Sequence, residues 1–145
     1  MTKPHLTNRA CAVPSSITVD QGGGFSPWVT DLGLQFESLA PEKVVMRLPF
    51  DPRLCRAGGI ICGQAFMAVA DTIAVFAMWA AAGDVRACTT VDAAVQMMRP
   101  VSDADVLAEA TVPRLGRTMA VVSVLLHADG DPRPAVSTSV TLALV

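Results

Sequence analysis

The sequence predicts a single α+β domain in which an antiparallel β-sheet packs on one long helix. Three observations lead to this fold class. The chain has 145 residues, enough for one domain with one hydrophobic core. Residues 63–82 form a nearly unbroken apolar segment rich in helix formers, whereas the segments around it alternate apolar and polar residues with a period of two. Strands that run before and after one buried helix are typical of the α+β class.

The first thirty residues are expected to form an irregular arm ahead of a domain that spans 31–145. Residues 1–30 show no sustained periodicity, and they contain three prolines and a run of three glycines at 22–24. No apolar segment of the signal-peptide kind stands at the N-terminus, so the cytoplasm is the expected compartment.

Two short strands are expected between this arm and the helix. Apolar residues recur at every second position over 32–36 and again over 44–50, where they alternate with Lys43 and Arg47. Prolines and glycines between 49 and 59 then interrupt the strand pattern and lead into the helical segment.

Residues 63–82 are predicted to form a helix that is buried on every side. Its residues are apolar almost all round, and Gly83 provides a C-terminal stop. A stretch of this length could also span a bilayer. Asp71 lies in the middle of it, however, where a charge in lipid is costly, and the remaining chain is patterned as soluble strands. We therefore expect a core helix and no membrane partner.

Four longer strands are expected after the helix. The first alternates over 90–97, and the second runs over 106–112 with its even-numbered apolar residues facing inward. The third covers 118–126. Asp129-Gly130 is a hairpin signal that joins it to the last strand, over 136–144.

Composition excludes several classes of function. The formal net charge is −2 and the 11 basic residues are scattered, so no basic stripe is available for a nucleic acid. The four cysteines form no C-x-x-C pair and the two histidines, His5 and His127, do not stand at ligand spacing, so no metal site is predicted. The chain is 52% hydrophobic and only 17% charged, which favours a homo-oligomer whose copies cover each other's apolar surface.

Asp71 is the strongest candidate for a catalytic residue. It is the only charged residue in the apolar segment 63–82. A buried carboxylate without a partner costs several kcal/mol unless it faces a cavity, finds hydrogen-bond donors or becomes protonated. That cost suggests a function, because carboxylates in clefts are frequent active-site groups. The alternative is that Asp71 hydrogen-bonds a neighbouring backbone group for structural reasons alone.

A second candidate site lies at the start of the helix, at Gly63 and Gln64. The first amides of a helix have no intrahelical partner and lie at the positive end of its dipole, and a glycine there lets a carbonyl oxygen approach. Alternatively, these residues only cap the helix. Gly63 and Asp71 are eight residues apart, roughly 12 Å along a helix, so one carbonyl cannot contact both in one chain. If both act, a second, antiparallel copy must complete the site.

The sequence resembles the hotdog-fold acyl-CoA thioesterases of the phenylacetate-pathway type. The resemblance rests on the run from Gly58 to Thr72, on residues 89–92 and on Met98-Arg99-Pro100, and it extends from about residue 32 to residue 145. It implies a sheet wrapped around a central helix and the hydrolysis of an acyl thioester to a free acid and CoA, without a cofactor. In that family a His-Gly-Gly triplet opens the helix, and an acidic residue seven positions after its last glycine is the nucleophile or general base.

Cys62-Gly63-Gln64 stands in the place of this triplet, so the middle glycine and the acid are kept. Cys62 is expected to contact the substrate where the family has histidine. The family's upstream asparagine has no counterpart, because Asn8 is the only asparagine. These replacements leave a second hypothesis open, a hotdog protein that binds acyl thioesters or fatty acids without turnover. A hotdog hydratase is disfavoured, since by resemblance it needs a histidine where this chain has Phe76.

The resemblance also assigns roles to residues beyond the helix. Thr90 matches a family position whose hydroxyl holds the attacking water across the dimer, although threonine is also common in strands for structural reasons. Arg99, Arg114 and Arg117 resemble positions that contact the phosphates of CoA, which suits the guanidinium group, although strand-end arginines are often merely solvated. The implied partners are an acyl-CoA and further copies of the chain, in a dimer or a dimer of dimers.

Overall fold

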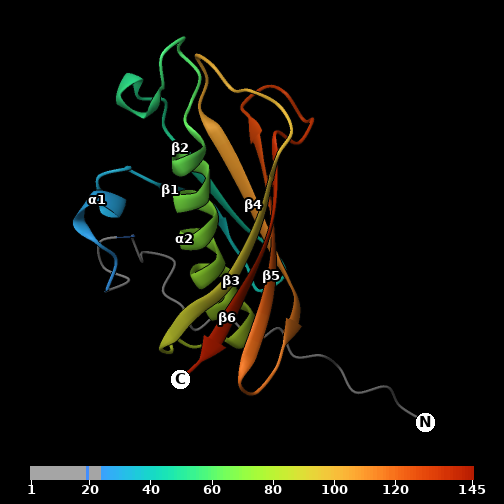
Figure 1. Ribbon diagram of the computed structural model, residues 1–145. Helices are drawn as coiled ribbons and strands as arrows, with labels where there is room; N and C mark the ends of the chain where they lie inside the picture. Colours follow the sequence, from blue (N-terminus) through green and yellow to red (C-terminus); the bar gives the residue numbers. More distant parts are fainter. Residues whose placement is uncertain (1–18, 20–23) are drawn as a thin grey trace.

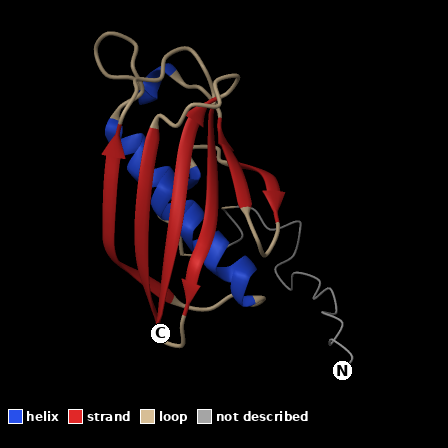
Figure 2. Ribbon diagram, turned by 90° about the vertical axis from the view of Figure 1, so that its right-hand side faces the viewer, coloured by secondary structure: helices blue, strands red, loops and turns tan. Residues whose placement is uncertain are grey.

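A computed structural model describes Val19 and residues 24–145 (Figure 1). In this part of the chain, six strands form one antiparallel sheet that wraps around the long helix α2, Gly63–Ala82. Figure 2 shows α2 crossing the sheet diagonally. Two short helical segments are also present: α1 (Pro27–Thr30) precedes the first strand, and the 3-10 turn η1 (Pro52–Leu54) precedes α2. The predicted α+β architecture is confirmed.

The strands occur in the predicted order along the chain. They are β1 (Gln35–Leu39), β2 (Val44–Leu48), β3 (Cys88–Met97), β4 (Val106–Leu115), β5 (Met119–Ala128) and β6 (Val136–Leu144). Across the sheet the order is β1-β2-β4-β5-β6-β3, and every neighbouring pair is antiparallel. The long strand β3 and the short strand β1 are therefore the two edges.

Helix α2 begins and ends where the sequence predicts. Gly83 adopts a left-handed conformation (φ +76°), and its N–H donates to the carbonyl oxygen of Trp79 at 2.8 Å, which closes the last turn. The helix is long and apolar enough to cross a membrane, but 67% of its most apolar window is buried inside the fold. Its apolar side chains are thus used in the core of the domain.

The prediction that α2 is buried on every side is wrong. Gln64, Met67 and Asp71 are exposed, and their spacing of three and four residues puts them on one side of the helix. We call them the exposed stripe of α2. The rest of the helix packs into the concave face of the sheet, where Phe76 is fully buried and stacks with Phe25 at a centroid distance of 5.4 Å.

The alternation predicted for the strands corresponds to the two faces of the sheet in β2 and β4, but not over 90–97, where an irregularity in the pairing of β3 between Thr90 and Asp92 changes the parity. Val44, Met46 and Leu48 of β2 are at most 1% exposed, and the inward residues Val106, Ala108 and Ala110 of β4 are fully buried. An irregularity in the pairing of β4 with β5 between Thr111 and Arg114 ends this regular pattern. The inward faces and α2 together form the core.

Element boundaries differ from the expectations in two connections. The strand expected from residue 32 begins only at Gln35, because Gly33 turns the chain with a φ of +69°. The connection signalled by Asp129-Gly130 spans residues 129–135, so it is longer than a tight hairpin, although Gly130 does adopt a positive φ of +86°.

Most of the predicted N-terminal arm lies outside the described residues, as do His5, Asn8 and Cys11. The described end of the arm contains α1, a helical turn that the sequence did not predict. Val19 is only 4% exposed and belongs to the core cluster. In Figure 1, α1 lies on the side of α2 opposite to the strands β4 and β5.

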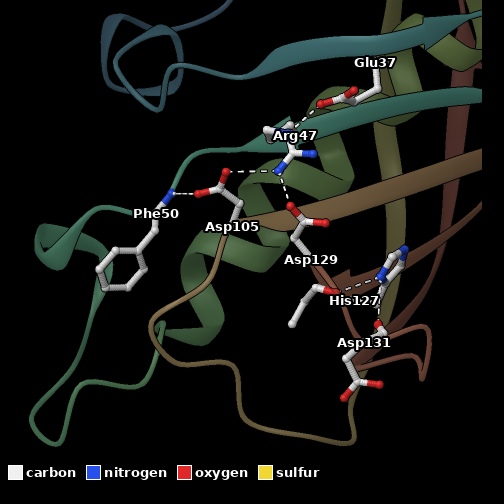
Figure 3. A network of polar contacts seen from close by, with 8 residues as sticks. Glu37, Arg47, Phe50, Asp105, His127, Asp129 and Asp131 are labelled. Carbon is white, nitrogen blue, oxygen red and sulfur yellow. Dashed lines mark hydrogen bonds and ion pairs between the residues drawn. The ribbon is translucent and has the colours of Figure 1, made fainter.

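A polar network joins several elements around Arg47 of β2 (Figure 3). The Arg47 guanidinium donates to Asp105 at 3.0 Å, to Asp129 at 2.7 Å and to Glu37 of β1. Asp105 also accepts a hydrogen bond from the backbone N–H of Phe50 at 2.7 Å. This N–H and the Arg47 guanidinium hold the pKa of the Asp105 carboxyl below its usual range. The network links β1, β2 and the loops next to β4 and β5.

Candidate active site

A cavity of about 340 Å³ lies beside the exposed stripe of α2. We call it the Asp71 cavity. Its walls come from α1, α2, β3 and β6, and they are mainly apolar. The lining residues are Trp28, Gln64, Met67, Ala68, Ala70, Asp71, Thr90, Ala93, Val95, Thr138 and Val140. An apolar cavity with a few polar groups is the usual form of a small-molecule site.

Asp71 and Thr90 form a hydrogen-bonded pair at this cavity. The Thr90 hydroxyl donates to Oδ1 of Asp71 at 2.6 Å. The second carboxylate oxygen has no hydrogen-bond partner within the described part of the chain. Asp71 is exposed, so the expectation of a buried carboxylate is wrong, and the pair joins the middle of α2 to the edge strand β3 within one chain.

The charge of Asp71 affects the thiol of Cys88. Burial, and to a smaller extent the negative charge of Asp71, raise the pKa of the Cys88 thiol. Thr90 and Cys88 are two residues apart on β3 and share the face that looks toward α2. Opposite them on β6 stand Leu142 and Leu144. The surroundings of Asp71 thus combine a hydroxyl donor with apolar groups.

A second cavity, of about 380 Å³, lies at the start of α2, and we call it the Gly63 cavity. Its lining residues are Arg56, Ile60, Ile61, Gly63, Phe66, Met97, Met98, Arg99 and Pro100. The amides of Gly63 and Gln64 precede the first bond of the helix, from the Ala65 N–H to the Cys62 carbonyl at 3.2 Å, and have no partner among the described residues. They are available to an incoming oxygen.

Gly63 also has a structural reason to be glycine. A Cβ atom at this position would stand 2.7 Å from the terminal carbon of Met97, so any side chain would displace Met97. Cys62 precedes the helix without a side-chain cap, and its N–H donates to the Leu54 carbonyl at 2.8 Å. The close approach of Met97 is therefore a packing reason for a glycine here, independent of any role of its amide and different from the capping role considered above.

The candidate residues do not converge in one chain. Gln64 and Asp71 line one cavity and Gly63 lines the other. Arg99 lines the Gly63 cavity, where its Nη1 donates to the Pro134 carbonyl at 2.6 Å.

Arg114 and Arg117 lie at the other end of the sheet. They flank the β4–β5 turn, where the Leu144 N–H donates to the Thr118 carbonyl at 2.8 Å and Leu144 pairs with Cys88 at the start of β3. Arg99, by contrast, follows the end of β3. The length of β3 therefore separates the two groups of arginines.

Trp28 and Thr138 are among the lining residues of the Asp71 cavity that the sequence analysis did not identify. Trp28 comes from a segment without periodicity, so no signal marked it. Thr138 stands in β6 at a position whose neighbours of the same parity are apolar, and this polar residue on an inward face was a signal that could have been used. Within residues 19 and 24–145, no group of three His, Cys, Asp or Glu side chains is placed to hold a metal ion.

A family model described as the thioesterase superfamily matches residues 58–135, more than half of the chain. No curated protein matches the sequence. Among solved structures, a thioesterase from Haemophilus influenzae is 23% identical with a TM-score of 0.75, over 81% of this chain and 82% of that one. A proposed esterase from Mycobacterium tuberculosis is 26% identical with a TM-score of 0.75, over 83% and 97%.

A hypothetical thioesterase from Streptococcus pneumoniae, solved with coenzyme A, is 14% identical with a TM-score of 0.68, over 77% of this chain and 85% of that one. At this identity the likeness concerns the fold alone. The family model, over residues 58–135, includes Gly63, Asp71 and Thr90. The strands β1, β2 and β6 lie outside that span.

Proposed function

Because the chain belongs to the thioesterase superfamily and has its hotdog fold, we propose that it is an acyl-CoA thioesterase that releases a free acid and CoA. The observation that carries this proposal is the Asp71–Thr90 pair at an apolar cavity. Thioester hydrolysis needs a basic group beside a water-accessible carbonyl and an apolar space for the acyl group. The coenzyme A in the similar fold from Streptococcus pneumoniae supports CoA as the leaving thiol.

Asp71 acts in one of two ways. As a general base, it takes a proton from the water that attacks the carbonyl carbon. As a nucleophile, it attacks that carbon itself, and water then cleaves the mixed anhydride. In both routes the carbon–sulfur bond breaks and the CoA sulfur leaves as the thiolate, which then takes up the proton that Asp71 or the medium receives from the water. The Thr90 hydroxyl orients the carboxylate through Oδ1 and leaves the other oxygen for water or the carbonyl.

The amides of Gly63 and Gln64 are the proposed oxyanion site. The charge that develops on the carbonyl oxygen is stabilised by free N–H groups at the positive end of a helix. Losing one such donor typically lowers the rate by about 10²–10³. Met97 lies over Gly63, but its side chain is unbranched and flexible, so an entering thioester can displace it.

A second copy of the chain completes the site in this proposal. The edge strand β3 exposes Val91 (56%) and Met97 (50%), and an exposed apolar edge favours pairing with another strand. Antiparallel pairing of two β3 strands sets the two α2 helices side by side in opposite directions. Asp71 of one copy then approaches Gly63 of the other. A shared site of this kind is needed if both residues act on one thioester, because they line different cavities within one chain.

The same pairing accounts for the scattered arginines. It brings the start of one β3 strand next to the end of the other, and therefore brings the partner's Arg114 and Arg117 to the same end of the joined sheet as Arg99 of this chain. Guanidinium groups from two copies would then meet the CoA phosphates. Further pairing of dimers into tetramers would leave this site unchanged. The free thiols of Cys55, Cys62 and Cys88 are consistent with the cytoplasm as the compartment.

The proposal is tested by thiol release from a series of acyl-CoAs of increasing chain length. We expect turnover with at least one member. Binding of acyl-CoA without any release of CoA would instead support the non-catalytic hotdog protein.

The shared site has its own test. Sedimentation at micromolar concentration is expected to show a dimer or tetramer and no monomer. An active monomer would contradict the two-copy site. The role of Asp71 would then still be tested separately, by Asp71→Asn.

A further inference from the structure

Met97, the last residue of β3, lies against the start of α2. A Cβ atom placed on Gly63 would be 2.8 Å from Sδ of Met97 and 2.7 Å from its Cε. Met97 is 50% exposed, and it lines the Gly63 cavity. Its thioether therefore lies beside the free amides of Gly63 and Gln64, and a small molecule in that cavity can reach it.

The direction of the Met97 side chain keeps it in the cavity when two β3 strands pair. Met97 stands opposite Val136 of β6, which is fully buried on the inward face of the sheet. Paired residues of neighbouring strands point to the same face, so Met97 points inward, toward α2, rather than along the free edge of β3. In the proposed function the acyl-CoA has to enter this cavity, and a peroxide is much smaller than an acyl-CoA. The thioether therefore stays within reach of a peroxide in the two-copy site.

Exposure alone does not distinguish Met97 from the other methionines that the structure describes. Two of them, Met46 and Met78, are fully buried, whereas three are about as exposed as Met97: Met67 (48%), Met98 (49%) and Met119 (44%). Met97 differs in its position, because no side-chain atom of those three lies within 4 Å of the Cβ position on Gly63. Oxidation of Met97 thus has a consequence at the start of α2 that oxidation of the other three lacks.

A peroxide oxidises a thioether to a sulfoxide in one two-electron step. The sulfur lone pair attacks one peroxide oxygen, the oxygen–oxygen bond breaks, and the sulfur keeps that oxygen while hydrogen peroxide is reduced to water. The sulfoxide is polar and its oxygen accepts hydrogen bonds, which the thioether does only weakly. Gly63 and Gln64 each offer an N–H without a partner among the described residues, so donor and acceptor are adjacent.

We propose that Met97 is a site of reversible oxidation by peroxides that controls access to the start of α2. In the sulfoxide form, the new oxygen accepts a hydrogen bond from the N–H of Gly63 or Gln64, which holds the side chain over Gly63. In the reduced form, the side chain is apolar and flexible and yields to the thioester. The effect on turnover rests on the proposed function, whereas the hydrogen bond itself does not.

The test treats the protein with hydrogen peroxide and compares the wild type with Met97→Leu and the control Met119→Leu. Met119 has a similar exposure at the start of β5 and lines neither the Asp71 cavity nor the Gly63 cavity. Leucine has a similar volume and forms no sulfoxide, so both variants are expected to fold.

Peptide mass spectrometry measures the sulfoxide at each methionine, and each kcat/KM value is compared with that of the same protein before treatment. A thiol reductant is added after the peroxide, because it reverses sulfenic acids and disulfides at Cys62 and Cys88 but leaves sulfoxides in place. The loss that remains is then assigned to methionine by methionine sulfoxide reductases, which should restore the activity.

We expect kcat/KM of the oxidised wild type and of oxidised Met119→Leu to fall by roughly three- to tenfold, because the thioester has to break one hydrogen bond to reach the amides. Met97→Leu should keep the value it has before treatment. An equal loss in Met97→Leu overturns the proposal. So does an undiminished rate in a wild type that carries the sulfoxide at position 97, or a position 97 that stays reduced while the other exposed methionines are oxidised.

The amide signals of Gly63 and Gln64 in nuclear magnetic resonance spectra test the hydrogen bond without any turnover. In isotope-labelled wild type, one of these two amide protons should move downfield when Met97 is oxidised, and neither should move in Met97→Leu. If the untreated wild type cleaves no thioester, the hydrolase assignment fails, and these signals alone decide the role of Met97. Two unchanged signals in a wild type that carries the sulfoxide at position 97 overturn the proposal, whatever the activity.

Discussion

Asp71 and Asp105 are carboxylates of one small domain with opposite surroundings. Asp105 accepts hydrogen bonds from the Arg47 guanidinium and from the Phe50 N–H, and Arg47 also binds Asp129 (Figure 3). Asp71 has a single neutral donor, the Thr90 hydroxyl, and faces an apolar cavity. A carboxylate held by a cation ties elements of the fold together, whereas a carboxylate with a free oxygen at a cavity is available for chemistry.

Asp71→Asn is expected to have the largest effect on turnover and so to distinguish Asp71 most clearly from the carboxylates around Arg47. The change is nearly isosteric and removes the charge and the basic oxygen, so turnover of acyl-CoA should fall by about 10²-fold or more while the fold is kept. Thiol release and a thermal melt measure the two properties. Asp129→Asn is the matched control, which should weaken the Arg47 network and leave kcat unchanged. Wild-type turnover in a folded Asp71→Asn protein would overturn the assignment.

Thr90→Val is expected to have the next largest effect. It removes the hydroxyl that orients Asp71 but leaves the carboxylate, so kcat should fall by roughly tenfold. Thr90→Ser keeps a hydroxyl and should restore most of the activity. The neighbouring Thr89→Val, an exposed site on the opposite face of β3, serves as the control. If Thr90→Val and Thr89→Val behave alike, Thr90 has only a structural role.

The sequence predicted the fold and the position of Asp71 better than the shape of the site. Strand parity and the apolar run at 63–82 determine which elements form, because burial of an apolar face dominates folding. Whether α2 is covered on every side depends on the neighbours that the sheet supplies, and here the exposed stripe of Gln64, Met67 and Asp71 has no cover from the described strands. The periodicity of the helix sequence does not indicate which of its sides other elements cover.

Local sequence patterns also did not predict which distant segments of the chain contact each other. Trp28 reaches the Asp71 cavity from a segment without periodicity, and the bond between Thr90 and Asp71 depends on how α2 crosses β3. The positions of Arg99 and Arg114 at opposite ends of the sheet, by contrast, follow from β4, which starts a short loop after Arg99 and ends at Leu115. The predicted strands already implied this separation.

Gln64→Gly is expected to change specificity rather than rate. The Gln64 side chain lines the same cavity as Asp71, and it fills space that the family's glycine leaves open. Removing it should move the ratio of kcat/KM values toward an aromatic acyl-CoA and away from a linear one by about tenfold. Met67→Ala widens the same cavity from the same stripe and is a useful comparison. A ratio that does not change in Gln64→Gly would mean that the side chain does not meet the acyl group.

The smallest expected effect is on the thermal stability of the fold, and it comes from the carboxylates bound to Arg47. Arg47→Gln leaves Glu37, Asp105 and Asp129 without their shared cation, so the melting temperature at pH 7 should fall by a few degrees while kcat at low temperature is kept. The melting curve and the thiol-release assay measure these two quantities. A wild-type melting temperature in Arg47→Gln would show that the network contributes nothing to stability.

The pH dependence of this difference has a definite sign. The pKa of Asp105 is lower in the folded protein than in the unfolded chain, where it is about 3.9. The Phe50 N–H is the main cause and the Arg47 guanidinium the second, so the Arg47 contribution stabilises the fold above that pH and is lost as the pH falls through the lower folded-state value. The gap between the wild type and Arg47→Gln should then shrink in acid. Both proteins retain the Arg133 contact that lowers the pKa of Asp131 to about 2, so both lose that stabilisation together between about pH 4 and pH 2. A gap that stays constant down to pH 2 would mean that Arg47 stabilises the fold by packing its side chain and not through its charge.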